Sequence, residues 1–160
     1  MRDIGDPPSP DLPPIPTGVM ADRILVDKSD RRMVLLRDGE VIAAYRIALG
    51  FGADDGPKRV QGDGRTPEGL YEIDWRNPDS RFHLSLHISY PSKADRARAH
   101  TMDQAPGGDI MIHGLPNGME WVDAAHARQD WTEGCIAVTN AEMQEIWRHV
   151  PNGTPIEIRA

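Results

Sequence analysis

Short apolar runs, separated by polar or glycine-rich turns, recur along most of the chain and predict a mainly β domain. Three runs near the start, at residues 23–27, 32–36 and 41–49, are expected to form an antiparallel meander. Asp38-Gly39 favours a two-residue hairpin between the last two, because both positions tolerate a positive φ. Later runs predict further strands at residues 70–75, 82–89, 109–113, 135–138 and 154–158.

Two segments carry the signals of short helices. Residues 92–99 are expected to form one, with Ser92 as its N-cap and Asp95 near its positive end. Thr139, followed three residues later by Glu142, forms a capping box that opens a second helix. That helix should end at residues 151–153, and its apolar stripe predicts four core residues: Met143, Ile146, Trp147 and Val150.

Prolines set the N-terminal segment apart from the rest of the chain. Proline fixes φ and removes a backbone donor, so residues 1–20 are predicted to form an extended tail or linker. Residues up to about 18 should then lie outside the core, with a single domain at 21–160. The segment is either a spacer that holds the domain away from an anchor or a tail without a role.

Charge and hydropathy narrow the classes of function. The formal net charge of -7 argues against broad binding to nucleic acid or to an anionic membrane. No apolar run approaches the roughly 20 residues that cross a bilayer, so no membrane span is expected. The N-terminus lacks a basic stretch followed by an apolar core, so we expect no signal peptide in this sequence.

The chain has one cysteine, Cys135, which is either a packing residue or a nucleophile. A free thiol has a pKa of about 8.5, so it needs a histidine to share its proton at neutral pH. His113 ends a predicted strand, and flexible Gly114 follows it, so the imidazole is well placed to face the strand of Cys135. Gly134 permits the tight turn and the close substrate approach that an acyl-transfer site needs.

Other polar groups leave alternatives open. His83 and His87 share one face of a predicted strand, which is a spacing that can bind zinc. Because the sequence offers no third ligand, we expect no metal and no cofactor. The basic residues of the first helix form either a solvated face or an edge that meets anionic peptides: Lys93, Arg96 and Arg98.

The cysteine segment resembles the signature of the L,D-transpeptidase (YkuD) catalytic domain family: a histidine, a spacer, Ser/Thr-His-Gly-Cys and a downstream asparagine. The matching residues here are His113-Gly114, Thr132-Glu133-Gly134-Cys135 and Asn140. The strands at 23–49, the last strand and the glycine-rich loop at 50–69, which ends Arg65-Thr66-Pro67-Glu68-Gly69, fit the same layout. The resemblance covers about residues 22–159 and implies a β-sandwich or barrel-like fold with two or three short helices.

The resemblance also implies a reaction, which is cysteine-dependent acyl transfer on peptidoglycan stem peptides. Cys135 would attack the amide between the L-configured centre of diaminopimelate and the terminal D-alanine, and the thioester would pass to an amine or to water. His113 would be the base, with the Gly114 carbonyl holding its other ring nitrogen. Backbone amides of Gly134 and Cys135 would bind the oxyanion, with support from Thr132. The family further implies a bacterial cell envelope or periplasmic location and inhibition by carbapenem-type β-lactams.

Two positions depart from the family pattern: Glu133 stands where most members have histidine, and Ala137 where many have arginine. Alanine in place of arginine removes a positive charge, and glutamate in place of histidine adds a negative one. These two changes should alter how the site binds substrate carboxylates. The pattern resembles a divergent branch that includes enzymes releasing proteins from peptidoglycan. Hydrolysis of the same L,D-type amide and a catalytically silent peptidoglycan-binding module therefore both stand as alternatives. Candidate substrate contacts are Glu133, His87, Tyr90 and two tryptophans expected in a cleft wall, Trp121 and Trp131.

Overall fold

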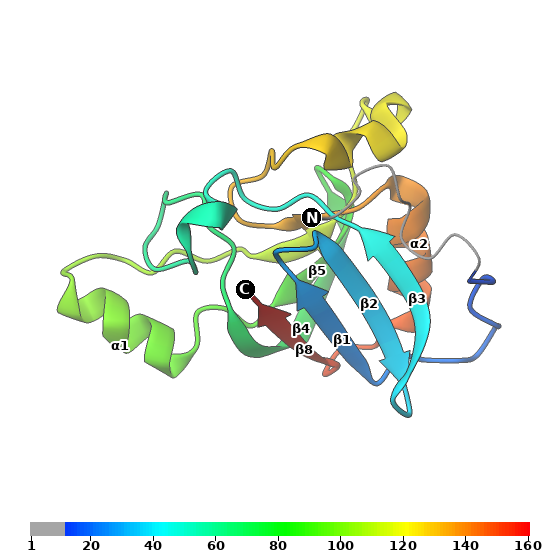
Figure 1. Cartoon of the computed structure of the whole chain (residues 1–160), viewed down its shortest axis with the longest axis horizontal. Helices are drawn as coiled ribbons and strands as arrows, with labels where there is room; N and C mark the ends of the chain where they lie inside the picture. The colour runs from blue at the N-terminus through cyan, green and yellow to red at the C-terminus, as the bar shows by residue number, and fades with distance from the viewer. Residues whose placement is uncertain (1–11) are drawn as a thin grey trace.

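A computed structural model describes residues 12–160 and arranges them around one curled sheet of eight strands (Figure 1). The strands are β1 Arg23–Asp27, β2 Arg32–Arg37, β3 Glu40–Arg46, β4 Gly69–Ser80, β5 His83–Ile88, β6 Met111–His113, β7 Ile136–Ala137 and β8 Pro155–Arg159. Their order across the sheet is β3-β2-β1-β8-β4-β5-β6-β7. The mainly β, barrel-like fold predicted from the sequence is therefore confirmed.

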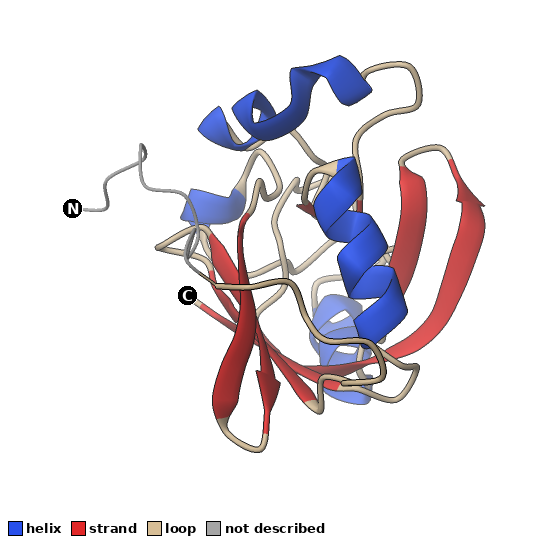
Figure 2. Cartoon of the chain, turned by 90° about the vertical axis from the view of Figure 1, so that its right-hand side faces the viewer, coloured by secondary structure: helices blue, strands red, loops and turns tan. Residues whose placement is uncertain are grey.

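Two α-helices and two 3-10 helices complete the fold. They are α1 Lys93–Thr101, α2 Asn140–His149, η1 Ala53–Asp55 and η2 Glu120–Arg128. The sheet curls around α2, which packs on β5 and β6 (Figure 2). Among residues 12–160, no helix combines the length and the apolar character that crossing a membrane requires.

Local chemistry explains the elements that the sequence predicted well. Asp38 and Gly39 both have positive φ, at 53° and 81°, and join β2 to β3 as the hairpin signal indicated. Ser92 and Thr139 each cap a helix in a full capping box, with Asp95 and Glu142 as the reciprocal partners. Each box satisfies backbone donors that the first helical turn leaves unpaired.

The apolar stripe of α2 faces the core, with one exception. Met143, Ile146 and Val150 are buried at the centre of the hydrophobic cluster. Trp147 is only partly buried, and the Arg76 guanidinium lies 4.8 Å from the centre of its ring. The prediction that Trp147 is a core residue is therefore only partly met, because it lies at the edge of the cluster.

Three strand boundaries differ from the predictions for reasons of long-range pairing. The strand predicted at 41–49 ends at Arg46, and the chain then crosses the molecule, where Ala48 pairs with Ala137 and Gly50 with Thr132. The strand predicted at 70–75 extends to Ser80, because it forms a long hairpin with β5. The strand at 135–138 shrinks to two residues, which pair in parallel with β6, and Ala137 also forms the bridge to Ala48.

The N-terminal segment contributes to the core, contrary to the expectation that residues up to about 18 lie outside it. Ile15 is buried in the hydrophobic cluster, and its N–H donates to Glu145 Oε2 at 3.3 Å. The imidazole of His149, at the end of α2, lies 2.7 Å from the Val19 carbonyl. Of the predicted proline-rich tail, residues 1–11 lie outside the described residues.

Candidate active site

The parallel pairing of β6 with β7 brings the two halves of the predicted motif together. His113 stands opposite Ala137, and Ile112 stands opposite Ile136. Cys135 directly precedes β7, so its side chain shares the face of Ala137 and therefore that of His113. Adjacent strands lie about 4.8 Å apart, so we infer from this register that the imidazole and the thiol face the same side of the sheet.

Three contacts fix the imidazole of His113, which is 3% exposed. Its Nδ1 lies 2.7 Å from the Gly114 carbonyl, which can only accept, so Nδ1 carries the proton and Nε2 has the free lone pair. The ring stacks on Phe82, with centroids 4.3 Å apart, and meets the Trp131 ring at 5.8 Å. Burial lowers the pKa of His113 to about 4, although the Gly114 carbonyl partly offsets the shift. The imidazole is thus neutral at pH 7.

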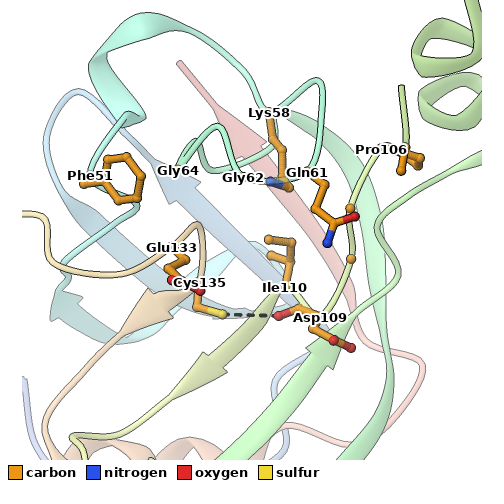
Figure 3. A pocket seen from close by; sticks show the side chains of 13 residues that line it. Phe51, Lys58, Gln61, Gly62, Gly64, Pro106, Asp109, Ile110, Glu133 and Cys135 are labelled. Atoms are coloured by element: carbon orange, nitrogen blue, oxygen red, sulfur yellow. Dashed lines mark hydrogen bonds between the residues drawn. The ribbon is translucent and has the colours of Figure 1, made fainter. Parts of the chain in front are cut away.

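The sulfur of Cys135 lines an open pocket of about 550 Å³ (Figure 3). The thiol donates a hydrogen bond to the Asp109 carbonyl at 3.3 Å. Among the residues that the structure describes, no hydrogen bond joins the thiol to His113. Burial raises the pKa of Cys135 to about 11; the charges of Asp109 and Glu133 add to the shift, and the Met111 amide and Lys58 oppose it.

The turn before the sulfur requires glycine at one position. Gly134 has a φ of +138°, and a Cβ there would lie 2.8 Å from the Arg65 carbonyl and 3.0 Å from Ile110 Cδ1. The Thr132 hydroxyl donates to the Cys135 carbonyl at 2.7 Å and accepts from the Gly134 N–H at 3.1 Å. One of the two amides predicted to bind an oxyanion is therefore already paired with Thr132 in this state.

The first residue of α2 supports the histidine segment. Asn140 Oδ1 accepts from the Leu115 N–H at 2.8 Å, and a Cβ on Gly114 would lie 2.5 Å from the same oxygen. Gly114 therefore has to be glycine, because the asparagine approaches its backbone so closely. The Gly114 N–H also donates to the Phe82 carbonyl at 2.9 Å, which ties the segment to the β4–β5 hairpin.

A buried lysine holds the glycine-rich loop in place. Lys28, 3% exposed, donates to the Thr66 carbonyl at 2.7 Å and forms an ion pair with Glu68 at 3.0 Å. The Thr66 hydroxyl accepts from the Gly50 N–H at 3.1 Å. A side chain on Gly50 would clash with Gly64 and with Gly134. The loop thus packs directly against the cysteine turn and forms part of the pocket.

Sequence reasoning missed several residues that the fold brings to the site. Lys58, 4% exposed, lines the cysteine pocket and forms an ion pair with Asp63 at 3.0 Å. Asp109 lines the same pocket, and Phe82 packs on the imidazole. None of the three belongs to a short motif, so no local pattern identified them. Asn140, which supports the histidine segment, could be found from the sequence because it belongs to the family signature.

Of the predicted substrate contacts, Glu133 lies in the cysteine pocket. Trp131 lines a separate hollow of about 570 Å³, its ring centre lies 5.8 Å from that of His113, and its Nε1 donates to His126 Nδ1 at 3.3 Å. Trp121, 78% exposed, projects from η2. Tyr90 is buried and donates to the Pro106 carbonyl, which places it behind the pocket wall.

The two histidines considered as zinc ligands have separate partners. His87 Nδ1 lies 2.6 Å from Asp74 Oδ1, and its ring stacks on Trp75. His83 Nε2 lies 3.2 Å from Gln144 Nε2. Within residues 12–160, no group of three or more His, Cys, Asp or Glu side chains is arranged to hold a metal ion.

Comparison with protein families and curated proteins gives a consistent result. The family model described as "L,D-transpeptidase catalytic domain" (YkuD) matches residues 21–158. The "Putative L,D-transpeptidase YafK" of Escherichia coli K12 is 32% identical over 114 residues, which is 69% of this chain and 38% of that protein. The chain thus aligns with well under half of the length of this relative.

Solved structures show the same fold. The helical cell shape determining protein Pgp2 from Campylobacter jejuni matches with a TM-score of 0.62 and 23% identity, over 98% of this chain and 52% of that chain. An L,D-transpeptidase from Mycobacterium smegmatis matches with a TM-score of 0.58 and 18% identity, over 88% of this chain and 59% of that chain. At these identities the likeness supports the architecture alone.

Proposed function

The chain belongs to the L,D-transpeptidase (YkuD) catalytic domain family, and we propose that it transfers acyl groups from peptidoglycan stem peptides through a thioester on Cys135. The single observation that supports the proposal is the β6–β7 pairing, in which His113 stands opposite Ala137, two residues after the pocket-lining Cys135. The natural setting of such a substrate is the bacterial cell envelope or periplasm.

The neutral state of both groups determines how the reaction begins. With an imidazole pKa of about 4 and a thiol pKa of about 11, no thiolate–imidazolium pair exists beforehand. The sulfur turns from the Asp109 carbonyl towards Nε2 of His113, which accepts the thiol proton as sulfur attacks the substrate carbonyl carbon. The Gly114 carbonyl stabilises the imidazolium that forms, because it accepts from Nδ1.

Collapse of the tetrahedral intermediate completes the first half of the reaction. The carbon–nitrogen bond breaks, and the imidazolium returns its proton to the departing amine of D-alanine, which leaves the acyl group on sulfur. An amine or water then attacks the thioester, His113 takes its proton, and the sulfur leaves as the thiol. Transpeptidation and hydrolysis share every step up to this acceptor.

The backbone around the sulfur supplies the oxyanion site in this proposal. The Cys135 N–H, and the Gly134 N–H once it is released from Thr132, would donate to the developing negative charge. Thr132 holds both ends of the turn, so its role is to position the amides.

A catalytically silent peptidoglycan-binding module is the second candidate. The observation in its favour is the state of the thiol, which is hydrogen-bonded to Asp109 and has a pKa of about 11. Such a module would bind stem peptides in the same pocket without forming a covalent bond to sulfur.

Incubation with a carbapenem, followed by intact mass spectrometry, separates the two candidates. The wild-type protein should gain the mass of one carbapenem, Cys135→Ala should gain none, and His113→Ala should react at least about 100-fold more slowly. His100→Ala, which changes an exposed histidine on α1, is the matched control and should react like the wild type. An unmodified wild-type protein that still binds muropeptides would support the silent module and contradict the enzyme.

A further inference from the structure

The cysteine pocket carries an unequal set of charges. Three ionisable side chains besides the thiol line it, and these are Lys58, Asp109 and Glu133. The one cation is engaged, because Lys58 Nζ donates to Asp63 at 3.0 Å and to the Val60 carbonyl at 3.2 Å. Both lysine and aspartate are largely buried, so this pair leaves little positive charge for a ligand.

The two carboxylates of the pocket, unlike the lysine, are exposed. Asp109 and Glu133 are both exposed, and in Figure 3 the sulfur of Cys135 lies between them. Their charges reach the sulfur, since each contributes to the raised pKa of the thiol. A substrate carbonyl bound over the sulfur would therefore lie within the field of two negative groups.

The position of Glu133 is set by the turn that precedes the nucleophile. Thr132 and Gly134, the residues on either side, are buried and joined by the hydrogen bond to Thr132 Oγ1. The glutamate backbone consequently has little freedom to move away from the pocket. This backbone keeps the Glu133 carboxylate within reach of the pocket that it lines.

Taking the proposed function as its premise, we propose that Glu133 and Asp109 make the cysteine pocket selective for acyl donors that carry a free ammonium group near the scissile amide. The second amino group of a diaminopimelate side chain is such a cation. Donors in which that amine is acylated, as in a stem that already forms a cross-link through it, would be disfavoured. Glu133 and Asp109 are specificity-determining residues in this scheme, and the bond-making steps stay with Cys135 and His113.

Binding to a protein that cannot react tests the selectivity by itself. The probes are a stem tetrapeptide ending in diaminopimelate-D-alanine and the same peptide acetylated on the diaminopimelate side-chain amine. In the Cys135→Ala background, calorimetry should show the free-amine peptide binding at least about fivefold more tightly, a preference that falls as salt rises from 50 to 500 mM.

Substitution of the glutamate separates charge from bulk, since acetylation also enlarges the peptide. Glu133→Gln should reduce the preference by about two- to threefold, Glu133→Asp should retain most of it, and Glu40→Gln on the exposed end of β3 should leave it unchanged. A preference that Glu133→Gln does not alter, or equal affinity for the two peptides, would overturn the inference.

The binding assay and the carbapenem assay fail independently. Peptide selectivity without any covalent adduct on the wild type would remove the proposed enzyme and keep the charge selectivity. An adduct on the wild type together with equal binding of both peptides would keep the enzyme and remove the selectivity.

Discussion

Burial sets the protonation of the two groups on which the proposed chemistry depends. His113 packs in a cluster with the rings of Phe82 and Trp131, and the Cys135 thiol lies in a pocket whose exposed charges are negative. Both environments favour the uncharged form, which is why the pKa of the imidazole falls and that of the thiol rises. In the proposed reaction, proton transfer must therefore accompany the attack on substrate.

Glu133→Gln should lower the pKa of the Cys135 thiol, because it removes one of the two negative charges near the sulfur. Since only thiolate reacts, alkylation by iodoacetamide at pH 8 to 9 should become about threefold faster than in the wild type. Intact mass spectrometry over time gives the rate. Glu40→Gln serves as the control of equal charge change, and an unchanged rate in Glu133→Gln would rule out the electrostatic effect.

Phe82→Ala should raise the pKa of His113 from about 4 towards 6.5, because water would reach the face of the ring that Phe82 now covers. A proton NMR titration of the imidazole Cε1–H measures the shift. A titration midpoint that stays near 4 would show that the neighbouring phenyl ring has no part in the desolvation.

The sequence pointed to the pair of residues proposed to react but not to the residues around them. Cys135, His113, Gly134 and Asn140 belong to a signature that lies within residues 113–140 and can be recognised from the sequence alone. Phe82 and Lys58 reach the site only after β5 pairs with β6 and the glycine-rich loop folds back, so the sequence carries no local signal for them.

Among the elements, the turn between Thr132 and Cys135 has strict requirements at one position. Its one left-handed residue also touches the glycine-rich loop, so conformation and space both demand glycine. The sequence correctly predicted the hairpin and the two helix N-caps, because each depends on residues no more than three positions apart. The bridge between Ala48 and Ala137 was not, because its partners are brought together only by the complete sheet.

Gly134→Ala should lower the free energy of unfolding by about 3 kcal/mol, because a Cβ adds a collision with the Arg65 carbonyl to the strain of positive φ. Gly153→Ala is the matched control, since Gly153 has a φ of +91° with nothing within 4 Å of an added Cβ. Its cost should be about 1 kcal/mol, from conformation alone. Urea denaturation measures both, and equal losses would mean that the contact between turn and loop is unimportant.

For the molecule as a whole, two buried histidines link stability to pH. The pKa values of His113 and His126 are lowered to about 4, mainly by burial, so the unfolded chain binds more protons than the folded one between pH 6.5 and 4. The free energy of unfolding therefore has its full value above pH 6.5 and falls as the pH drops from 6.5 to 4. The cost at pH 4.5 is about 2 to 3 kcal/mol for each histidine.

Urea denaturation at pH 7.5 and 4.5 measures that loss, and His126→Gln should remove about half of it. Gln keeps an acceptor for the Trp131 N–H while eliminating the titrating group. A wild-type protein equally stable at both pH values would show that these imidazoles are already accessible to protons when folded.

The sequence predicted the fold class but not the order in which the strands pair. Eight short strands were visible in the hydrophobic pattern, whereas the parallel pairing of β1 with β8 and of β6 with β7 depends on contacts between distant segments. The burial of Ile15 was likewise not predicted, because the surrounding prolines indicated an extended tail. Composition characterises a whole segment and cannot show that one side chain within it packs in the core.

Trapping the acyl-enzyme on its proposed substrate tests the central claim most directly. The wild-type protein is mixed with a stem tetrapeptide ending in diaminopimelate-D-alanine, quenched in acid within seconds and weighed intact. We expect a mass increase equal to the peptide minus D-alanine, located on Cys135 and released by hydroxylamine. Release of D-alanine that continues undiminished in Cys135→Ala would contradict the account.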